Sequence, residues 1–343
     1  MNLQDYAHRI PKTELHVHLE GSIRPATLIE LARRNDIPIP AQTEAELADF
    51  YRYRDFAHFV DVYWTITRCL RTPEDYRLIA YEYGCSCARQ NIRYAEVTFT
   101  IATNTRFTGL SWQAVLDGLN AGREQARAEF GVDWGWVFDI CRDDPETQDA
   151  VVDIALAARP FGVVGLGLGG SEAKFPPELF ISSFERARQA GLKRLPHAGE
   201  TAGPPSIWTA LKQLQADRLG HGVRCIEDPK LVDHLSLLGV PLEVCPTSNV
   251  RLGVFPDYAS HPLRRLWDQG LTITLGSDDP PMFGTDLSME YQVLVDHFNF
   301  TADELERLSL NGIQASCLTG PQKAKLAAEF EAEFSRLRPE ITT

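Results

Sequence analysis

The sequence has 343 residues, of which 44% are hydrophobic and 24% are charged, a composition typical of a globular protein with a large apolar core. Its 34 Lys and Arg against 47 Asp and Glu give a net charge of −13, which argues against nucleic acid or an anionic membrane as a partner. The amino-terminal residues show no apolar leader and no run of about 18 apolar residues follows, so we expect a cytoplasmic protein without a membrane partner.

The first predicted strand covers residues 14–19 and alternates between two kinds of side chain. A period of two places His16 and His18 on one face and three aliphatic residues on the other. Two imidazoles at this spacing on a rigid strand can converge on a metal ion. They can equally be two partly exposed histidines, so this stretch alone leaves both readings open.

A long segment, residues 41–70, follows a predicted helix over residues 23–35. It carries an apolar series at helical spacing: Phe56, Phe59, Val60, Tyr63 and Trp64. This pattern predicts a helix that packs against the core. Because the segment is inserted after the first strand, the same helix can serve as a lid over that strand's carboxyl end and contact a substrate.

From residue 73 onward, predicted helices and strands alternate. Strands are predicted over residues 92–99, 134–140, 163–168, 192–197, 218–220, 241–244 and 271–275, and helices over residues 73–90, 111–130, 144–158, 177–191, 206–215, 230–238 and 262–268. Eight strands in strict alternation with helices predict a single α/β domain over residues 1–343, a (β/α)₈ TIM barrel with a helical lid insertion after strand 1. Extra carboxyl-terminal helices follow, beginning with a capping box at Thr301 and Glu304.

Polar side chains follow four of the later predicted strands, where barrel strands share one rim. They are His197 and Glu200 after the fifth strand, His221 after the sixth, Thr247, Ser248 and Asn249 after the seventh, and Asp278 and Asp279 after the eighth. Together with the two histidines of the first strand, His197 and Asp278 complete a set of three imidazoles and one carboxylate. That set suits Zn²⁺ and also accepts Fe²⁺ or Co²⁺. The fourth strand has no lysine to bridge a second metal, so we expect one metal ion per chain.

The remaining polar residues predict acid–base chemistry beside that metal. Glu200 lies close to the metal without being needed as a ligand and can act as a general acid. His221 can orient a metal-bound water or take its proton. Asp279 can hydrogen-bond a substrate, and Gly170 allows a backbone N–H to approach a ligand edge.

Five segments together resemble the signatures of the adenosine deaminase family, in the same order along the chain. They are Pro11-Lys12-Thr13-Glu14-Leu15-His16-Val17-His18-Leu19-Glu20-Gly21, His197-Ala198-Gly199-Glu200, Leu219-Gly220-His221-Gly222, Cys245-Pro246-Thr247-Ser248-Asn249 and Ser277-Asp278-Asp279-Pro280. The resemblance covers about residues 5 to 320. It implies a zinc-containing barrel hydrolase that replaces the 6-amino group of a purine nucleoside with oxygen.

The resemblance also implies roles for individual residues. Four of them carry over as ligands of one Zn²⁺: His16, His18, His197 and Asp278. Glu200 carries over as the proton donor to ring N1, and His221 as the group that orients the metal-bound hydroxide. Asp279 carries over as the partner of N7, and Gly170 as the backbone donor to N3.

Two positions depart from the family's adenosine-specific members. Residues 167–172 read Gly-Leu-Gly-Gly-Ser-Glu in place of Asp-Leu-Ala-Gly-Asp-Glu, and Glu20 stands in place of an aspartate that contacts the ribose 5′-hydroxyl. The Gly-Leu-Gly-Gly sequence of residues 167–170 resembles that of the branch that deaminates 6-amino-6-deoxyfutalosine. Gly167 removes a strand-end charge and makes room, and Phe56, Phe59 and Tyr63 could cover an aryl extension. We therefore expect the substrate to be adenosine or a 5′-extended adenosine derivative.

Three alternatives stay open at this stage. The chain could be another mononuclear metal hydrolase acting on a cyclic amide, amidine or ester, or a deaminase of free adenine. It could also be a binding protein that keeps the barrel without catalysis, although no predicted ligand is missing. The sequence makes no prediction about the oligomeric state.

Overall fold

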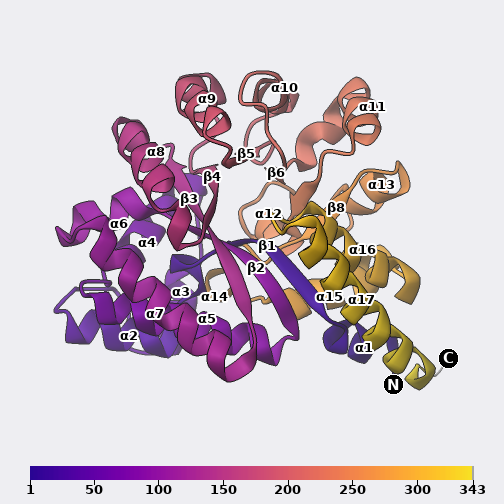
Figure 1. Ribbon diagram of the computed structural model, residues 1–343, viewed down its shortest axis with the longest axis horizontal. Helices are drawn as coiled ribbons and strands as arrows, with labels where there is room; N and C mark the ends of the chain where they lie inside the picture. Colours follow the sequence, from indigo (N-terminus) through magenta and orange to yellow (C-terminus); the bar gives the residue numbers. More distant parts are fainter. Residues whose placement is uncertain (342–343) are drawn as a thin grey trace.

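The structure is a computed structural model that describes residues 1–341. Its centre is a parallel sheet of eight strands in sequential order (Figure 1). The strands are β1 (Lys12–His18), β2 (Ile92–Phe99), β3 (Asp133–Cys141), β4 (Val163–Gly169), β5 (Lys193–Ala198), β6 (Leu219–His221), β7 (Leu242–Val244) and β8 (Ile273–Leu275). Each predicted strand is present. Relative to the prediction, β6 is shifted by one residue and β8 begins two residues later.

The ring closes through Asp278, just after β8. The Asp278 backbone pairs with Val17 of β1, its N–H donates to the His16 carbonyl at 3.1 Å, and its carbonyl accepts from His18 N–H at 2.8 Å. This closure confirms the predicted (β/α)₈ barrel, and it joins three of the predicted metal ligands by main-chain hydrogen bonds.

Helices surround the strands on the outside of the barrel (Figure 1). After the lid segment they are α5 (Pro73–Arg89), α6 (Ile101–Thr108), α7 (Trp112–Phe130), α8 (Gln148–Ala157), α9 (Ile181–Gln189), α10 (Pro204–Lys212), α11 (Pro229–Leu238), α12 (Pro246–Arg251) and α13 (Leu263–Asp268). Single-turn 3₁₀ helices cover Glu20–Ser22, Pro145–Thr147, Arg159–Phe161, Pro177–Phe180, Val223–Glu227 and Arg338–Glu340.

The apolar core lies between the strands and these helices. On β3, for example, Phe138 and Ile140 are fully buried in the core, whereas Asp139 between them lines the interior cavity. This is the two-residue alternation of a strand whose outer face is covered by helices.

The lid insertion after β1 consists of α2 (Pro25–Arg34), α3 (Glu44–Phe50) and α4 (Phe56–Thr67). The apolar series from Phe56 to Trp64 lies in one helix, α4, as predicted, and Asp55 caps this helix by accepting a hydrogen bond from His58 N–H. The lid is fixed to the part of the rim that follows β8, next to β1, where Phe59 stacks on Phe283 with ring centroids 5.5 Å apart. The predicted insertion is therefore confirmed.

The two ends of the chain lie side by side at the lower right of Figure 1, and the remaining helices come from the amino-terminal residues and from the segment after β8. They are α1 (Leu3–Arg9), α14 (Pro280–Phe283), α15 (Leu287–Phe298), α16 (Ala302–Ala315) and α17 (Gly320–Leu337). The predicted capping box of Thr301 and Glu304 begins α16. Ser309 of α16 donates to the Pro11 carbonyl at 2.6 Å, so the carboxyl-terminal helices support the start of β1.

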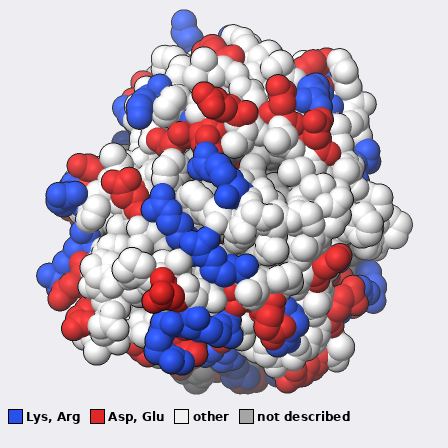
Figure 2. Space-filling model, turned by 90° about the vertical axis from the view of Figure 1, so that its left-hand side faces the viewer, with Lys and Arg blue, Asp and Glu red and all other residues white. Residues whose placement is uncertain are grey.

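The net negative charge is not spread evenly over the surface. Figure 2 shows a band of Lys and Arg side chains running diagonally across the face on the left of Figure 1, bordered by Asp and Glu. In the part of the chain that the structure describes, no helix is both long and apolar enough to cross a membrane.

Candidate active site

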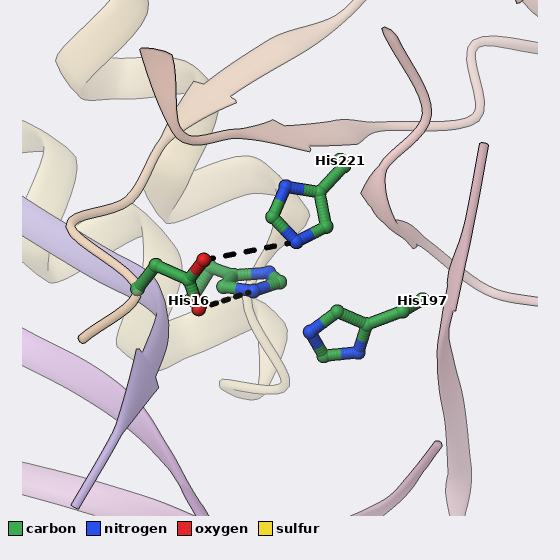
Figure 3. A group of neighbouring side chains, drawn as sticks. His16, His197 and His221 are labelled. Atoms are coloured by element: carbon green, nitrogen blue, oxygen red, sulfur yellow. Dashed lines mark ion pairs between the residues drawn. The ribbon is translucent and has the colours of Figure 1, made fainter. Parts of the chain in front are cut away.

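Side chains from four strands converge at the carboxyl rim of the barrel. Figure 3 shows the rings of His16, His197 and His221 turned toward a common centre. One ligand atom from each of these histidines and from Asp278 lies within 4.8 Å of the others, and all four residues are buried. Such a group fits a mononuclear metal site.

His18 lies at the same centre. Its Nε2 atom is 3.4 Å from His197 Nε2 and 3.5 Å from Asp278 Oδ1, and His16 Nε2 is 3.6 Å from that same oxygen. A tetrahedral ion with bonds of about 2.1 Å separates its ligand atoms by about 3.4 Å. Three ligand-atom separations within the predicted set of His16, His18, His197 and Asp278 are therefore close to the tetrahedral value.

In two histidines, a hydrogen bond at Nδ1, the ring nitrogen that points away from the site, leaves Nε2 free to bind a metal. His16 Nδ1 donates to Glu243 Oε2 at 3.0 Å, and His197 Nδ1 donates to the Leu168 carbonyl at 2.8 Å. His16 Nε2 is buried and has no hydrogen-bond partner. Arg218 in turn holds Glu243. Hydrogen bonding of the outer nitrogen is what fixes ligand tautomers in metal sites.

His221 is held differently. Its Nδ1 atom faces the Asn249 amide Nδ2 at 3.1 Å, and Asn249 Oδ1 faces His261 Nε2 at 3.1 Å. Since the amide nitrogen donates, His221 Nδ1 accepts, and the proton of the neutral ring lies on Nε2. Burial lowers the pKa of His221 to about 3, so the ring is neutral. An Nε2–H group can donate a hydrogen bond into the site but offers no lone pair to a metal.

Two of these residues occupy a strained backbone conformation. The φ angles of His221 and Asp278 are 59° and 62°, in the left-handed region that non-glycine residues rarely adopt. Such strain is concentrated at functional sites, where surrounding contacts hold the residue in place. Here the pairing of Asp278 with β1 is one such contact.

Glu200 follows β5 and lies beside His221, with Oε1 3.7 Å from His221 Nε2. Burial, together with the carboxylates of Asp278 and Glu172, holds the pKa of Glu200 well above its usual range. A carboxylic acid that stays protonated near neutral pH can serve as a general acid.

Glu172 organises the loop that carries Glu200. Its carboxylate accepts hydrogen bonds from the backbone N–H groups of four consecutive residues, 199–202, at 2.7 to 3.1 Å. Ser206 Oγ adds a further bond at 2.5 Å. Nearby, the buried Arg142 donates to the His197 carbonyl at 2.7 Å. The backbone of both His197 and Glu200 is therefore held by buried charged groups that the sequence analysis did not identify.

Asp279 and Gly170 face the cavity beside the metal-ligand group. Burial and the neighbouring Asp278 carboxylate hold the pKa of Asp279 well above its usual range, and its Oδ1 has no hydrogen-bond partner. A protonated Asp279 can donate to a heteroaromatic nitrogen. Gly170 has a φ of 100°, a conformation that favours glycine.

The cavity is roofed by helix α4, which contributes five of its lining residues. Phe56, Phe59 and Tyr63 all line it, as predicted for the lid. Glu20 is not among the lining residues: it is fully buried, and its Oε1 accepts from Thr100 N–H at 3.1 Å and from Asn104 Nδ2 at 2.7 Å. Its other oxygen, Oε2, has no partner.

Comparison with known proteins places the chain among deaminases. The family model described as "Adenosine deaminase" matches residues 11–333. The chain is 42% identical over 335 residues to an aminodeoxyfutalosine deaminase of Streptomyces avermitilis. The alignment covers 96% of this chain and 93% of that protein.

Two solved structures have the same architecture. The crystal structure of an adenine deaminase from Arthrobacter aurescens matches with a TM-score of 0.90 and 32% identity, covering 95% of this chain and 99% of that one. An amidohydrolase from Burkholderia ambifaria, described with bound Zn, matches with the same TM-score and identity, covering 98% of this chain and 94% of that one.

Proposed function

Because this chain belongs to the adenosine deaminase family, we propose that it is a zinc-dependent deaminase of 6-aminopurine nucleosides that prefers a 5′-extended adenosine such as 6-amino-6-deoxyfutalosine. Water replaces the 6-amino group, which leaves as ammonia, and the product is the 6-oxopurine. The main support is one cavity that brings the metal-ligand group, Glu200, Asp279 and Gly170 together under the α4 lid.

We assign the metal to His16, His18, His197 and Asp278. The ligand-atom separations of 3.4 to 3.6 Å support this set, and the proton on His221 Nε2 argues against His221 as a ligand. Bound there, Zn²⁺ supplies Lewis-acid chemistry that brings the pKa of a coordinated water to about 7. One ion per chain is expected.

The protein side chains then act on the purine and on the water. Glu200 gives its proton to ring N1, which makes the adjacent carbon more electrophilic. His221 donates from Nε2 to orient the attacking water. Asp279 binds N7 and the Gly170 N–H binds N3, which together fix the ring plane over the site. Each role follows the resemblance, and the protonation states described above support it.

Deamination of free adenine is the second candidate. The similarity to an adenine deaminase over nearly the whole chain supports it. The two candidates share the purine-binding residues, and they differ in whether the enzyme uses the substituent on N9.

A substrate panel distinguishes these candidates. We expect the highest kcat/KM for 6-amino-6-deoxyfutalosine, lower values for 5′-methylthioadenosine and adenosine, and the lowest for adenine, because the aromatic lid residues can cover an aryl extension. Ammonia release measures each rate. A kcat/KM for adenosine at least tenfold above that of the extended nucleosides would show that the preference for an extension is wrong. A dominant value for adenine would establish the second candidate.

Replacing Glu172 with glutamine is expected to reduce kcat about 10- to 100-fold with little change in KM. A glutamine has only one acceptor oxygen for four backbone N–H donors, so the loop would hold Glu200 less accurately. Kinetics and metal content measure the effect, and Glu185→Gln on the exposed face of α9 is the matched control. An unchanged kcat, or a loss that merely follows lost metal, would contradict a positioning role.

A further inference from the structure

A second group of polar side chains lines the cavity, on elements other than those that carry Glu200 and His221. It comes from α4, from α6 after β2, and from β3, whereas Glu200 follows β5 and His221 ends β6. In a closed ring of eight sequential strands, β2 and β3 lie opposite β6 and β7. Tyr63, Thr103 and Asp139 of this group all line the cavity.

Each of these three residues has a buried oxygen without a hydrogen-bond partner: Tyr63 Oη, Thr103 Oγ1 and Asp139 Oδ1. Asp139 is only 3% exposed. Unpartnered polar atoms in protein interiors are rare, and each calls for an explanation. Since an ionised carboxylate only accepts hydrogen bonds, the ligand group that fits Asp139 is a donor such as a hydroxyl.

The glycines of β4 provide the space for Asp139. Asp139 pairs in register with Gly167, and a Cβ atom at Gly167 would lie 2.9 Å from the Cβ of Asp139. A Cβ atom at Gly169 would lie 3.3 Å from Asp139 Oδ2. The aspartate of the family's fourth-strand signature would therefore collide with Asp139. The sequence predicts that Gly167 removes a negative charge from this side of the cavity. The charge is still present, because Asp139 of β3 places a carboxylate beside Gly167.

We propose that Asp139 accepts a hydrogen bond from a ribose hydroxyl of the substrate and thereby selects a nucleoside over free adenine. This inference rests on the proposed function. A substrate extended at the 5′ position keeps only its 2′- and 3′-hydroxyls as ribose donors, so one of these is the group that Asp139 binds. Carboxylates bind ribose hydroxyls in the same way in dinucleotide-binding folds.

The test compares Asp139→Asn with the native protein on adenosine, 6-amino-6-deoxyfutalosine and adenine. Asparagine keeps the shape but loses the charge, so kcat/KM for both nucleosides should fall about 10- to 100-fold. The value for adenine should change less than about threefold, and metal content should stay the same. Asp133→Asn, at the other end of β3, is the matched control and should leave all three values unchanged.

Deoxynucleosides identify the hydroxyl. The native protein should turn over either 2′-deoxyadenosine or 3′-deoxyadenosine about 10- to 100-fold less efficiently than adenosine, and Asp139→Asn should add no further loss on that analogue. The deoxynucleoside comparison tests the inference even when the variant does not fold, because it needs only the native protein. Equal turnover of both deoxynucleosides and adenosine by the native protein overturns the inference.

The outcomes separate this inference from the function on which it rests. Native turnover of nucleosides, with equal losses for adenosine and adenine in Asp139→Asn, overturns the role of Asp139 alone. Native turnover of adenine without any nucleoside overturns the proposed function itself, and that result appears before any variant is made.

Discussion

Glu200→Gln is expected to keep its metal and to lose about 10²- to 10⁴-fold in kcat. Glutamine reproduces the shape of the side chain but has no acidic proton to give to the ring nitrogen. Burial and two neighbouring carboxylates raise the pKa of the native Glu200, which favours the protonated state that this step requires. Glu200 has no place in the assigned ligand set, so the metal should be unaffected.

Steady-state kinetics and metal analysis of the same preparation test this expectation. The exposed Glu146, changed to glutamine, is a control for the substitution itself and should leave kcat unchanged. A near-normal kcat in Glu200→Gln would identify another group as the acid, and loss of metal would move Glu200 into the coordination sphere.

Asp278→Ala is expected to abolish metal binding and with it all measurable turnover, whereas Asp279→Ala should retain one metal and lose about 10- to 100-fold in kcat/KM. Asp278 lies 3.5 and 3.6 Å from two of the assigned histidine ligands, and its Oδ2 accepts from Ser248 Oγ at 2.6 Å. Asp279 instead lines the cavity with an unpartnered oxygen.

Elemental analysis gives the metal content, and thermal unfolding provides a readout that does not depend on activity. A ligand that binds only the folded state raises its stability, so a chelator should lower the Tm of the native protein and of Asp279→Ala but not that of Asp278→Ala. Equal metal loss in both variants would mean that the two roles are misassigned, and two metals per native chain would contradict a mononuclear site.

The sequence by itself determined the barrel and the content of its rim. Alternation with a period of two identified the strands, and the order of helices and strands predicted a parallel ring in which residues such as His16, His197 and Asp278 meet. This worked because the carboxyl ends of all strands share one edge, so the place of a residue along its strand is enough to bring distant positions together.

Only the tertiary structure decided which groups lie beside those residues. Glu172 binds the backbone of residues 199–202, and no side-chain pattern reveals a partner that is main chain. The helices α6 and α12 were missed because they are short and contain β-branched residues, so packing rather than propensity stabilises them. The fit of Asp139 against Gly167 depends on the register between β3 and β4. Strand order follows from local periodicity, but register follows from side-chain packing between strands, which the sequence does not display.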